Sequence, residues 1–109
     1  MQELVARGLL NKALRQPGPL AAQDTLAMLL AHYDRPDASP AVRLVVARAL
    51  LFHSELEQDP RRAYGETGAA RATLEAVVAR FAACQDVELQ YQVTRARFGL
   101  AALDAAAAR

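Results

Sequence analysis

Few residues in this chain have both the type and the spacing that chemistry requires. His53 and Glu57 are four residues apart, so a helix would place an imidazole and a carboxylate on one face, where both can bind a metal ion. Two ligands do not complete a site, and His32 belongs to another segment. His32 with Asp34 also lacks the nucleophile of a catalytic triad. We therefore expect no catalytic residue, no metal site and no cofactor.

Arginine is the other residue type that could do chemistry. It supplies 12 of the 13 basic residues, against 12 acidic residues, and the signs are mixed along the chain. Guanidinium groups can recognise anions through paired N–H donors, but a coding bias towards alanine and arginine would give the same composition without any site. The balanced charge does not indicate a nucleic-acid-binding protein.

The composition indicates one all-α domain. Alanine occupies 25 of the 109 positions and leucine 16, whereas glycine and proline occupy five each, so strong helix formers dominate. The single cysteine, Cys84, excludes an intrachain disulfide and favours a reducing compartment. We expect a cytoplasmic protein with no signal peptide and no membrane-spanning segment.

Two phrases recur in alternation along the chain. The first phrase occurs as VARGLL, VARALL and VTRARF, at residues 5–10, 46–51 and 93–98. The second phrase occurs at residues 25–33 and 73–81, which align without a gap. Copies of the first phrase are 41 and 47 residues apart. Repeats with a period near 40 residues indicate a stacked array of helix pairs.

The positions of helix-breaking proline and glycine residues and the periodicity of apolar residues predict five helices, at about 2–16, 19–34, 40–58, 67–83 and 87–107. Pro17 and Pro19 end the first helix and begin the second, and Ser39 and Asp86 are suitable N-caps. The third helix is apolar on more than one face, as expected of a helix that is packed from both sides.

On the second helix of each pair, a small residue is followed by two larger ones, at Ala22, Leu26 and Leu29 and at Ala70, Leu74 and Val77. The first helices carry the pairs Leu9, Ala13 and Leu50, Ser54. With these residues and the alternating order of the two phrases, the chain resembles the tetratricopeptide repeat family over residues 2–103. The resemblance implies a right-handed α-solenoid of antiparallel helix pairs. The spacing departs from the family's repeat of about 34 residues, and Ala13, Ser54 and Ala101 stand where glycine is usual. A general α-solenoid and a compact five-helix bundle remain alternatives.

The resemblance also implies a groove, lined by the first helix of each pair, that binds a peptide or a partner helix. Equivalent positions in this groove are occupied by Arg7, Arg48 and Arg95. These side chains would bind an acidic peptide or a C-terminal carboxylate. Alternatively, each forms only a surface ion pair, with an acidic residue such as Asp24, Glu55 or Glu88.

The next equivalent row contains Asn11, Phe52 and Gly99. Members of the family that clamp chaperone tails carry asparagines and basic residues on these faces, so we do not expect this function here. Phe52 is either an apolar anchor in the groove or a core residue. The predicted binding residues are therefore Arg7, Asn11, Arg48, Phe52 and Arg95.

Seven extra residues lie between the third and fourth helices. This loop combines charge with an aromatic ring in Arg61, Arg62 and Tyr64, which are candidate contacts because such residues are enriched at binding hot spots. Alternatively, the segment forms a short helical turn that covers one end of the core.

We conclude from the sequence that the chain is a non-catalytic protein–protein interaction module with a protein or peptide partner and no nucleic-acid or membrane partner. Two structural roles are the alternatives. One is a homodimer through the alanine-rich C-terminal helix, and the other is a segment of a longer repeat scaffold, because a terminal repeat usually has a polar outer face.

Overall fold

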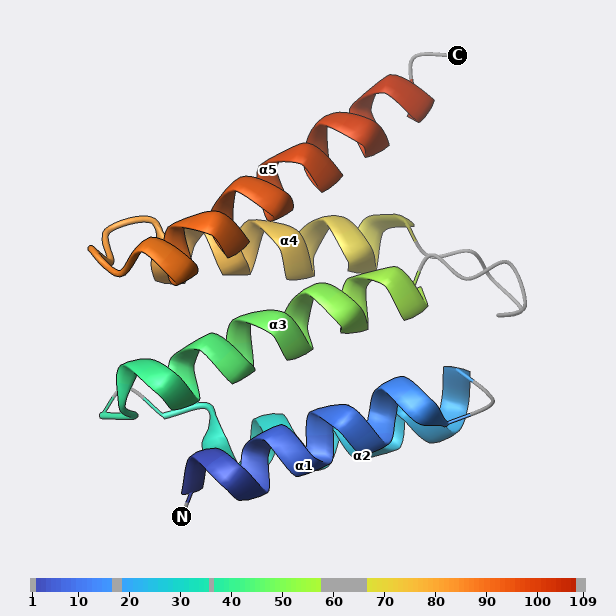
Figure 1. The fold of residues 1–109 in the computed structure, drawn as a ribbon. Coiled ribbons are helices and arrows are strands. Elements are labelled where there is room, and N and C mark those ends of the chain that lie inside the picture. Colours follow the sequence, from blue (N-terminus) through green and yellow to red (C-terminus); the bar gives the residue numbers. More distant parts are fainter. Residues whose placement is uncertain (1, 17–18, 36, 58–66, 108–109) are drawn as a thin grey trace.

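The computed structural model describes residues 2–16, 19–35, 37–57 and 67–107, which contain five α-helices and no strand (Figure 1). The helices are α1 (Gln2–Arg15), α2 (Pro19–Tyr33), α3 (Pro40–Glu57), α4 (Thr67–Phe81) and α5 (Val87–Ala107). The all-α prediction is thus confirmed. The helix bounds differ from the expected ones by at most two residues.

Two helix starts are fixed by the expected caps. The backbone N–H of Val42 donates to Ser39 Oγ (3.3 Å) at the start of α3. At the start of α5, Asp86 Oδ1 accepts from the N–H groups of Glu88 (2.9 Å) and Leu89 (3.3 Å). These bonds satisfy N–H groups that have no partner inside the helix.

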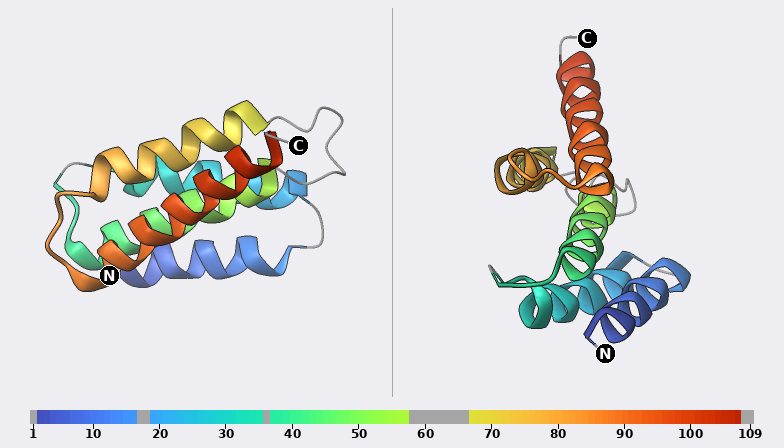
Figure 2. Two further views of the ribbon diagram at one scale, coloured as in Figure 1. Left: turned by 90° about the horizontal axis from the view of Figure 1, so that it is seen from above. Right: turned by 60° about the vertical axis from the view of Figure 1, so that its left-hand side comes forward.

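The helices form two layers. Helices α1, α3 and α5 lie one beside the next, and α2 and α4 lie on one side of them (Figure 2). Each odd-numbered helix contacts the next odd-numbered helix, and each even-numbered helix packs between two of them. The result is a slab of 45 × 32 × 18 Å, with the two termini at opposite ends (Figure 1).

The core lies between the two layers. The even-numbered helices contribute residues at helical spacing, namely Ala22, Leu26 and Leu29 from α2 and Ala70, Leu74 and Val77 from α4. Helix α3 is buried on several faces, through Val42, Val45, Val46, Ala47, Ala49, Leu51 and Leu56 among others. Its central position accounts for its unusually apolar sequence.

A hydrogen bond links the two helices of each pair at the same position of the repeat. Thr25 Oγ1 donates to Gln16 Oε1 at 2.7 Å, and Thr73 Oγ1 donates to Glu57 Oε1 at 2.7 Å. Gln16 and Glu57 are 41 residues apart, the distance between the first two copies of the first phrase, and both threonines begin the second phrase. We call these two bonds the inter-helix latches.

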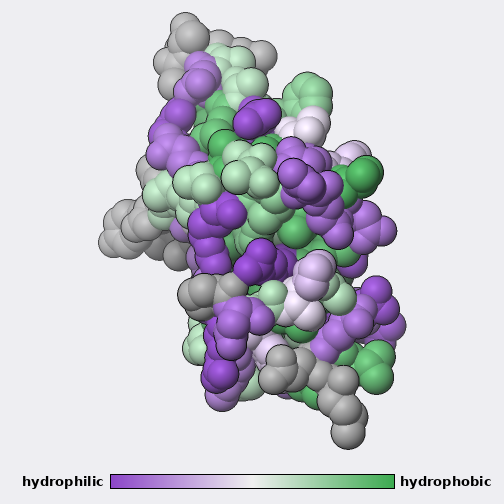
Figure 3. All heavy atoms as spheres, turned by 90° about the vertical axis from the view of Figure 1, so that its left-hand side faces the viewer, coloured by the Kyte–Doolittle hydropathy of each residue, from purple (hydrophilic) through white to green (hydrophobic). Residues whose placement is uncertain are grey.

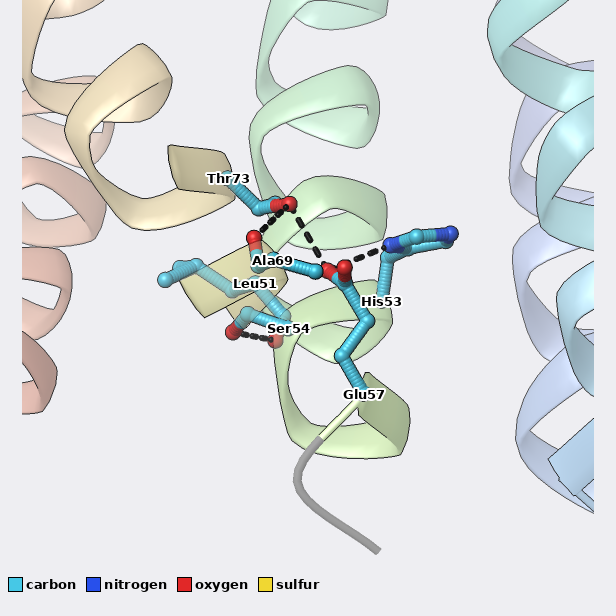
Figure 4. A network of polar contacts seen from close by, with 6 residues as sticks. All are labelled: Leu51, His53, Ser54, Glu57, Ala69 and Thr73. Atoms are coloured by element: carbon cyan, nitrogen blue, oxygen red, sulfur yellow. Dashed lines mark hydrogen bonds and ion pairs between the residues drawn. The ribbon is translucent and has the colours of Figure 1, made fainter. Parts of the chain in front are cut away.

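The second latch belongs to a larger buried network (Figure 4). Glu57 Oε1 also contacts His53 Nδ1 at 2.9 Å, and Glu57 is only 6% exposed. Nearby, Ser54 Oγ donates to the carbonyl oxygen of Leu51 at 2.6 Å. The Glu57 carboxylate thus has two partners from two helices, as a buried polar group requires.

Two ion pairs join segments that are distant in the sequence. Arg80, near the end of α4, forms a bidentate pair with Asp34, which follows α2, and its Nη1 lies 2.7 Å from Asp34 Oδ2. Arg71 on α4 lies 2.7 Å from Asp104 on α5. The α4–α5 turn is also fixed by Gln90, whose amide donates to the Ala82 carbonyl at 3.0 Å.

Candidate functional site

A hollow of about 120 Å³ lies across the odd-numbered helices. It is lined by Leu10 and Leu14 from α1, by Arg48, Phe52 and Glu55 from α3, and by Arg95 from α5. Three of the five residues predicted in the first helices of the repeats are therefore brought together here: Arg48, Phe52 and Arg95.

Helical spacing explains why these side chains meet. On α3, Arg48, Phe52 and Glu55 are separated by four and three residues, which places them on one face of the helix. On α1, Leu10 and Leu14 are likewise four residues apart. Phe52 is half-buried, and its side chain both packs against the core and lines the hollow.

A second hollow of about 260 Å³ shares Glu55 and Arg95 with the first. It lies between α3 and α5, and its other lining residues are Leu51, Ser54, Leu74, Phe98 and Gly99. A Cβ at Gly99 would lie 3.0 Å from Leu74 Cδ1, so the absence of a side chain allows α5 to approach α4 closely. Because they share two residues, we treat the two hollows as one feature and call it the odd-helix groove.

The arginines of the odd-helix groove differ from Arg7 in their partners. Arg7 Nη2 lies 3.3 Å from Glu3 Oε1, one turn earlier on α1. Within the described ranges, Arg48 forms no ion pair, and Arg95 donates to the uncharged Gln92 Oε1 at 3.1 Å. Glu55 lines the same groove without forming an ion pair with either arginine. Two guanidinium groups at this groove are therefore available to an external carboxylate.

The remaining predicted residues lie elsewhere. Asn11 lines a broad depression of about 510 Å³ on the other side of α1, together with Gly8, Lys12, Arg15 and Gln16. Arg61, Arg62 and Tyr64 lie outside the described residues.

Sequence reasoning missed the aliphatic and acidic lining of the groove. Leu10 is three residues after Arg7, and Glu55 is seven after Arg48, so both share a face with the arginine of their own helix. Extending the arginine row by one and two turns along each helix would have found Leu10, Leu14 and Glu55.

Another hollow, of about 270 Å³, lies where α2, α3 and α4 meet. Its lining includes three arginines, Arg35, Arg43 and Arg80. Arg80 is held there by the carboxylate of Asp34 and lies 5.4 Å from the centre of the Phe81 ring. This pair therefore fixes the end of α4 against the α2–α3 connection.

The pair His53 and Glu57 serves the second inter-helix latch. Across residues 2–16, 19–35, 37–57 and 67–107 there is no group of three or more histidine, cysteine, aspartate or glutamate side chains that could hold a metal ion.

None of the helices in the described part of the chain is both long and apolar enough to cross a membrane. On the face shown in Figure 3, hydrophobic residues (green) reach the surface at several places between hydrophilic ones (purple). Comparisons with protein-family models, curated proteins and solved structures found no match.

Proposed function

We propose that this protein is a non-catalytic binding module that holds an acidic peptide, anchored by one apolar side chain, in the odd-helix groove. The observation that carries the proposal is the meeting of Arg48 and Arg95 with Phe52 in one hollow, without a carboxylate partner for either arginine among the described residues.

The order of helix contacts supports a tetratricopeptide-like α-solenoid as the scaffold. Consecutive helices contact each other, and α1, α3 and α5 also form a layer of their own. In such arrays, every unit buries its apolar face against its neighbours, and the surface formed by equivalent helices is used for binding. The odd-helix groove lies on that layer.

The chemistry of the lining defines the ligand. Each guanidinium can donate two parallel N–H bonds to a carboxylate. Phe52, Leu10 and Leu14 supply the apolar part of the lining, which suits a leucine or phenylalanine side chain of the ligand. Glu55 would repel any acidic residue of the peptide that lies next to it, and this repulsion sets the register in which the peptide binds.

The proposal is tested with two fluorescent nonapeptides, one with a central leucine flanked by glutamates and one with lysines in their place. We expect the glutamate peptide to bind more tightly. Arg48→Glu and Arg95→Glu should each weaken it at least about tenfold, which corresponds to about 1.4 kcal/mol.

The matched control is Arg7→Glu, which makes the same charge change on α1 at an arginine that is already paired with Glu3. We expect an effect of less than about threefold, because Arg7 does not line the hollow, its charge is already offset by Glu3, and attraction between exposed charges is screened by salt. Equal effects of Arg7→Glu and Arg48→Glu, or equal binding of the two peptides, would contradict the proposal.

A further inference from the structure

An apolar stripe runs along the outer face of α5. It consists of Val87, Tyr91, Thr94, Phe98, Ala101 and Ala105, with separations of four, three, four, three and four residues. All six are exposed, including Val87 (82%), Tyr91 (62%) and Phe98 (73%). A sustained alternation of three and four is the spacing by which one helix packs along another.

The repeat shows that this stripe occupies positions that are buried in the other units. Leu10 of α1, Leu51 of α3 and Phe98 of α5 are equivalent, yet they are 2%, 4% and 73% exposed. The positions about one turn before and one turn after these three residues show the same difference in exposure. The equivalents Ala6 and Ala13 in α1, and Ala47 and Ser54 in α3, are all buried, whereas Thr94 and Ala101 are exposed.

The covering elements differ between the three helices. Helix α1 is packed against α2 and α3, and α3 is packed against α4 and α5 on the equivalent side. Within the described residues, α5 contacts only α3 and α4, both of which precede it. We infer that the outer face of α5 binds an amphipathic helix of another protein, in the place that α2 takes on α1 and α4 takes on α3.

The flanks of the stripe specify an acidic partner. Arg95 directly follows the stripe residue Thr94 and Arg97 directly precedes the stripe residue Phe98, so the two arginines lie on opposite sides of the stripe near its centre. Among the residues described, Arg97 forms no hydrogen bond or ion pair, and Arg95 bonds only to Gln92. The partner helix therefore carries aspartate or glutamate beside its apolar stripe, as interhelical ion pairs require.

A second copy of α5 fits these flanks less well. In an antiparallel pair centred on the stripe, Arg95 would face Arg95 of the copy and Arg97 would face Arg97, so that like charges meet. In a parallel pair Arg97 would lie beside Ala102 and gain no ion pair.

The inter-helix latches add one more feature of the partner. Asp104 lies 47 residues after Glu57 and is its equivalent in α5. Its side chain is 65% exposed and accepts from Arg71 through Oδ1. A threonine or serine on the partner helix, placed as Thr25 and Thr73 are in this chain, would donate to the carboxylate of Asp104.

The probe for this surface is a helix-stapled synthetic peptide with the sequence of α2, residues 19–33, which contains the latch threonine Thr25. Two forms are compared. One carries Gln23→Glu and Met28→Glu, on either side of the buried face of α2, and the other carries Gln23→Lys and Met28→Lys. Binding to the full chain is followed by backbone chemical-shift changes.

We expect the glutamate probe to bind at least tenfold more tightly than the lysine probe and to shift the signals of Tyr91, Thr94 and Ala101. Ala101→Gln places a larger polar side chain in the stripe and should weaken binding at least tenfold. The matched control is Ala102→Gln, the same change at the next exposed residue, off the stripe, with an effect below twofold. Arg97→Gln should reduce the preference for the glutamate probe.

The test separates this inference from the proposed function, because Arg48→Glu disrupts the odd-helix groove and should leave probe binding unchanged. Absence of binding, equal binding of the two probes, or shifts confined to the groove residues of α1 and α3 would overturn the inference. A dimer detected by light scattering that Ala101→Gln dissociates would also overturn it, since a second copy would then be the occupant.

Discussion

The inter-helix latches allow a matched test of a buried hydrogen bond, because the same bond is made to a carboxylate in one unit and to an amide in the other. Thr73→Val replaces the donor to Glu57 by a side chain of almost the same shape, and Thr25→Val does the same for the bond to Gln16. Valine removes the hydroxyl without opening a cavity, so the change in the free energy of unfolding reports on the bond.

The structure sets the expected magnitudes. A hydrogen bond to a charged group contributes about 1.5–3 kcal/mol, and a neutral one about 0.5–1.5 kcal/mol. Glu57 keeps His53 as a partner at 2.9 Å after Thr73→Val, so we expect the lower end of the first range, about 1.5 kcal/mol. For Thr25→Val we expect about half of this value, because the acceptor is an uncharged amide on a residue that is only half-buried.

The assay is urea unfolding followed by the helical circular-dichroism signal, repeated by thermal unfolding. A change of 1 kcal/mol should lower the Tm by about 4–8 °C in a domain of this size. A double-mutant cycle with Glu57→Ala isolates the pair, because each single variant removes the bond between Thr73 and Glu57. The reasoning is refuted if Thr25→Val costs as much as Thr73→Val, or if the coupling in the cycle is below about 0.3 kcal/mol.

Three further predictions follow from burial, charge and helix propensity. In urea unfolding of the unbound protein, Leu51→Ala should lower the free energy of unfolding by about 2–5 kcal/mol, because Leu51 is buried. Phe98→Ala, at the equivalent position of the repeat, should change it by less than about 0.5 kcal/mol, because Phe98 is exposed. The side chains of Asp34 and Arg80 are 26% and 40% exposed, so their ion pair should contribute at most about 1 kcal/mol to the free energy of unfolding in a double-mutant cycle. The contribution should be smaller in about 1 M salt, and a contribution that salt does not change would contradict the surface character of the pair. Gly8→Ala should raise the Tm, because alanine stabilises an exposed helix by about 0.5–1 kcal/mol relative to glycine and its Cβ would meet nothing within 4 Å. Gly99→Ala should raise the Tm less, because its Cβ would lie 3.0 Å from Leu74 Cδ1.

Local signals account for what could be predicted from the sequence. The ends of the helices follow from prolines and capping side chains that act within a few residues, as Ser39 and Asp86 show. Leu26, Leu29, Leu74 and Val77 occupy equivalent positions of the second phrase at helical spacing, and all four are buried.

The partners of polar side chains could not be predicted in the same way. Arg7, Arg48 and Arg95 are equivalent in sequence, yet Arg7 finds Glu3 one turn away while Arg48 and Arg95 line the odd-helix groove. The bond between Glu57 and Thr73 joins residues 16 apart across two helices, so it depends on how the helices pack rather than on any local pattern. Polar partners across a packing interface are set by geometry that one sequence does not contain.

The central position of α3 has a consequence for partial unfolding. Helix α3 contacts each of the other four, whereas in the described residues neither α1 nor α2 touches α4 or α5. Apart from the Asp34–Arg80 ion pair, which joins α4 to the residue after α2, either outer pair can therefore detach while the other stays packed on α3, and the slowest amide exchange with deuterated solvent should be confined to α3. The molecule would then open from its two ends at independent rates, and a ligand that bridges α1, α3 and α5 would slow exchange in both pairs at once.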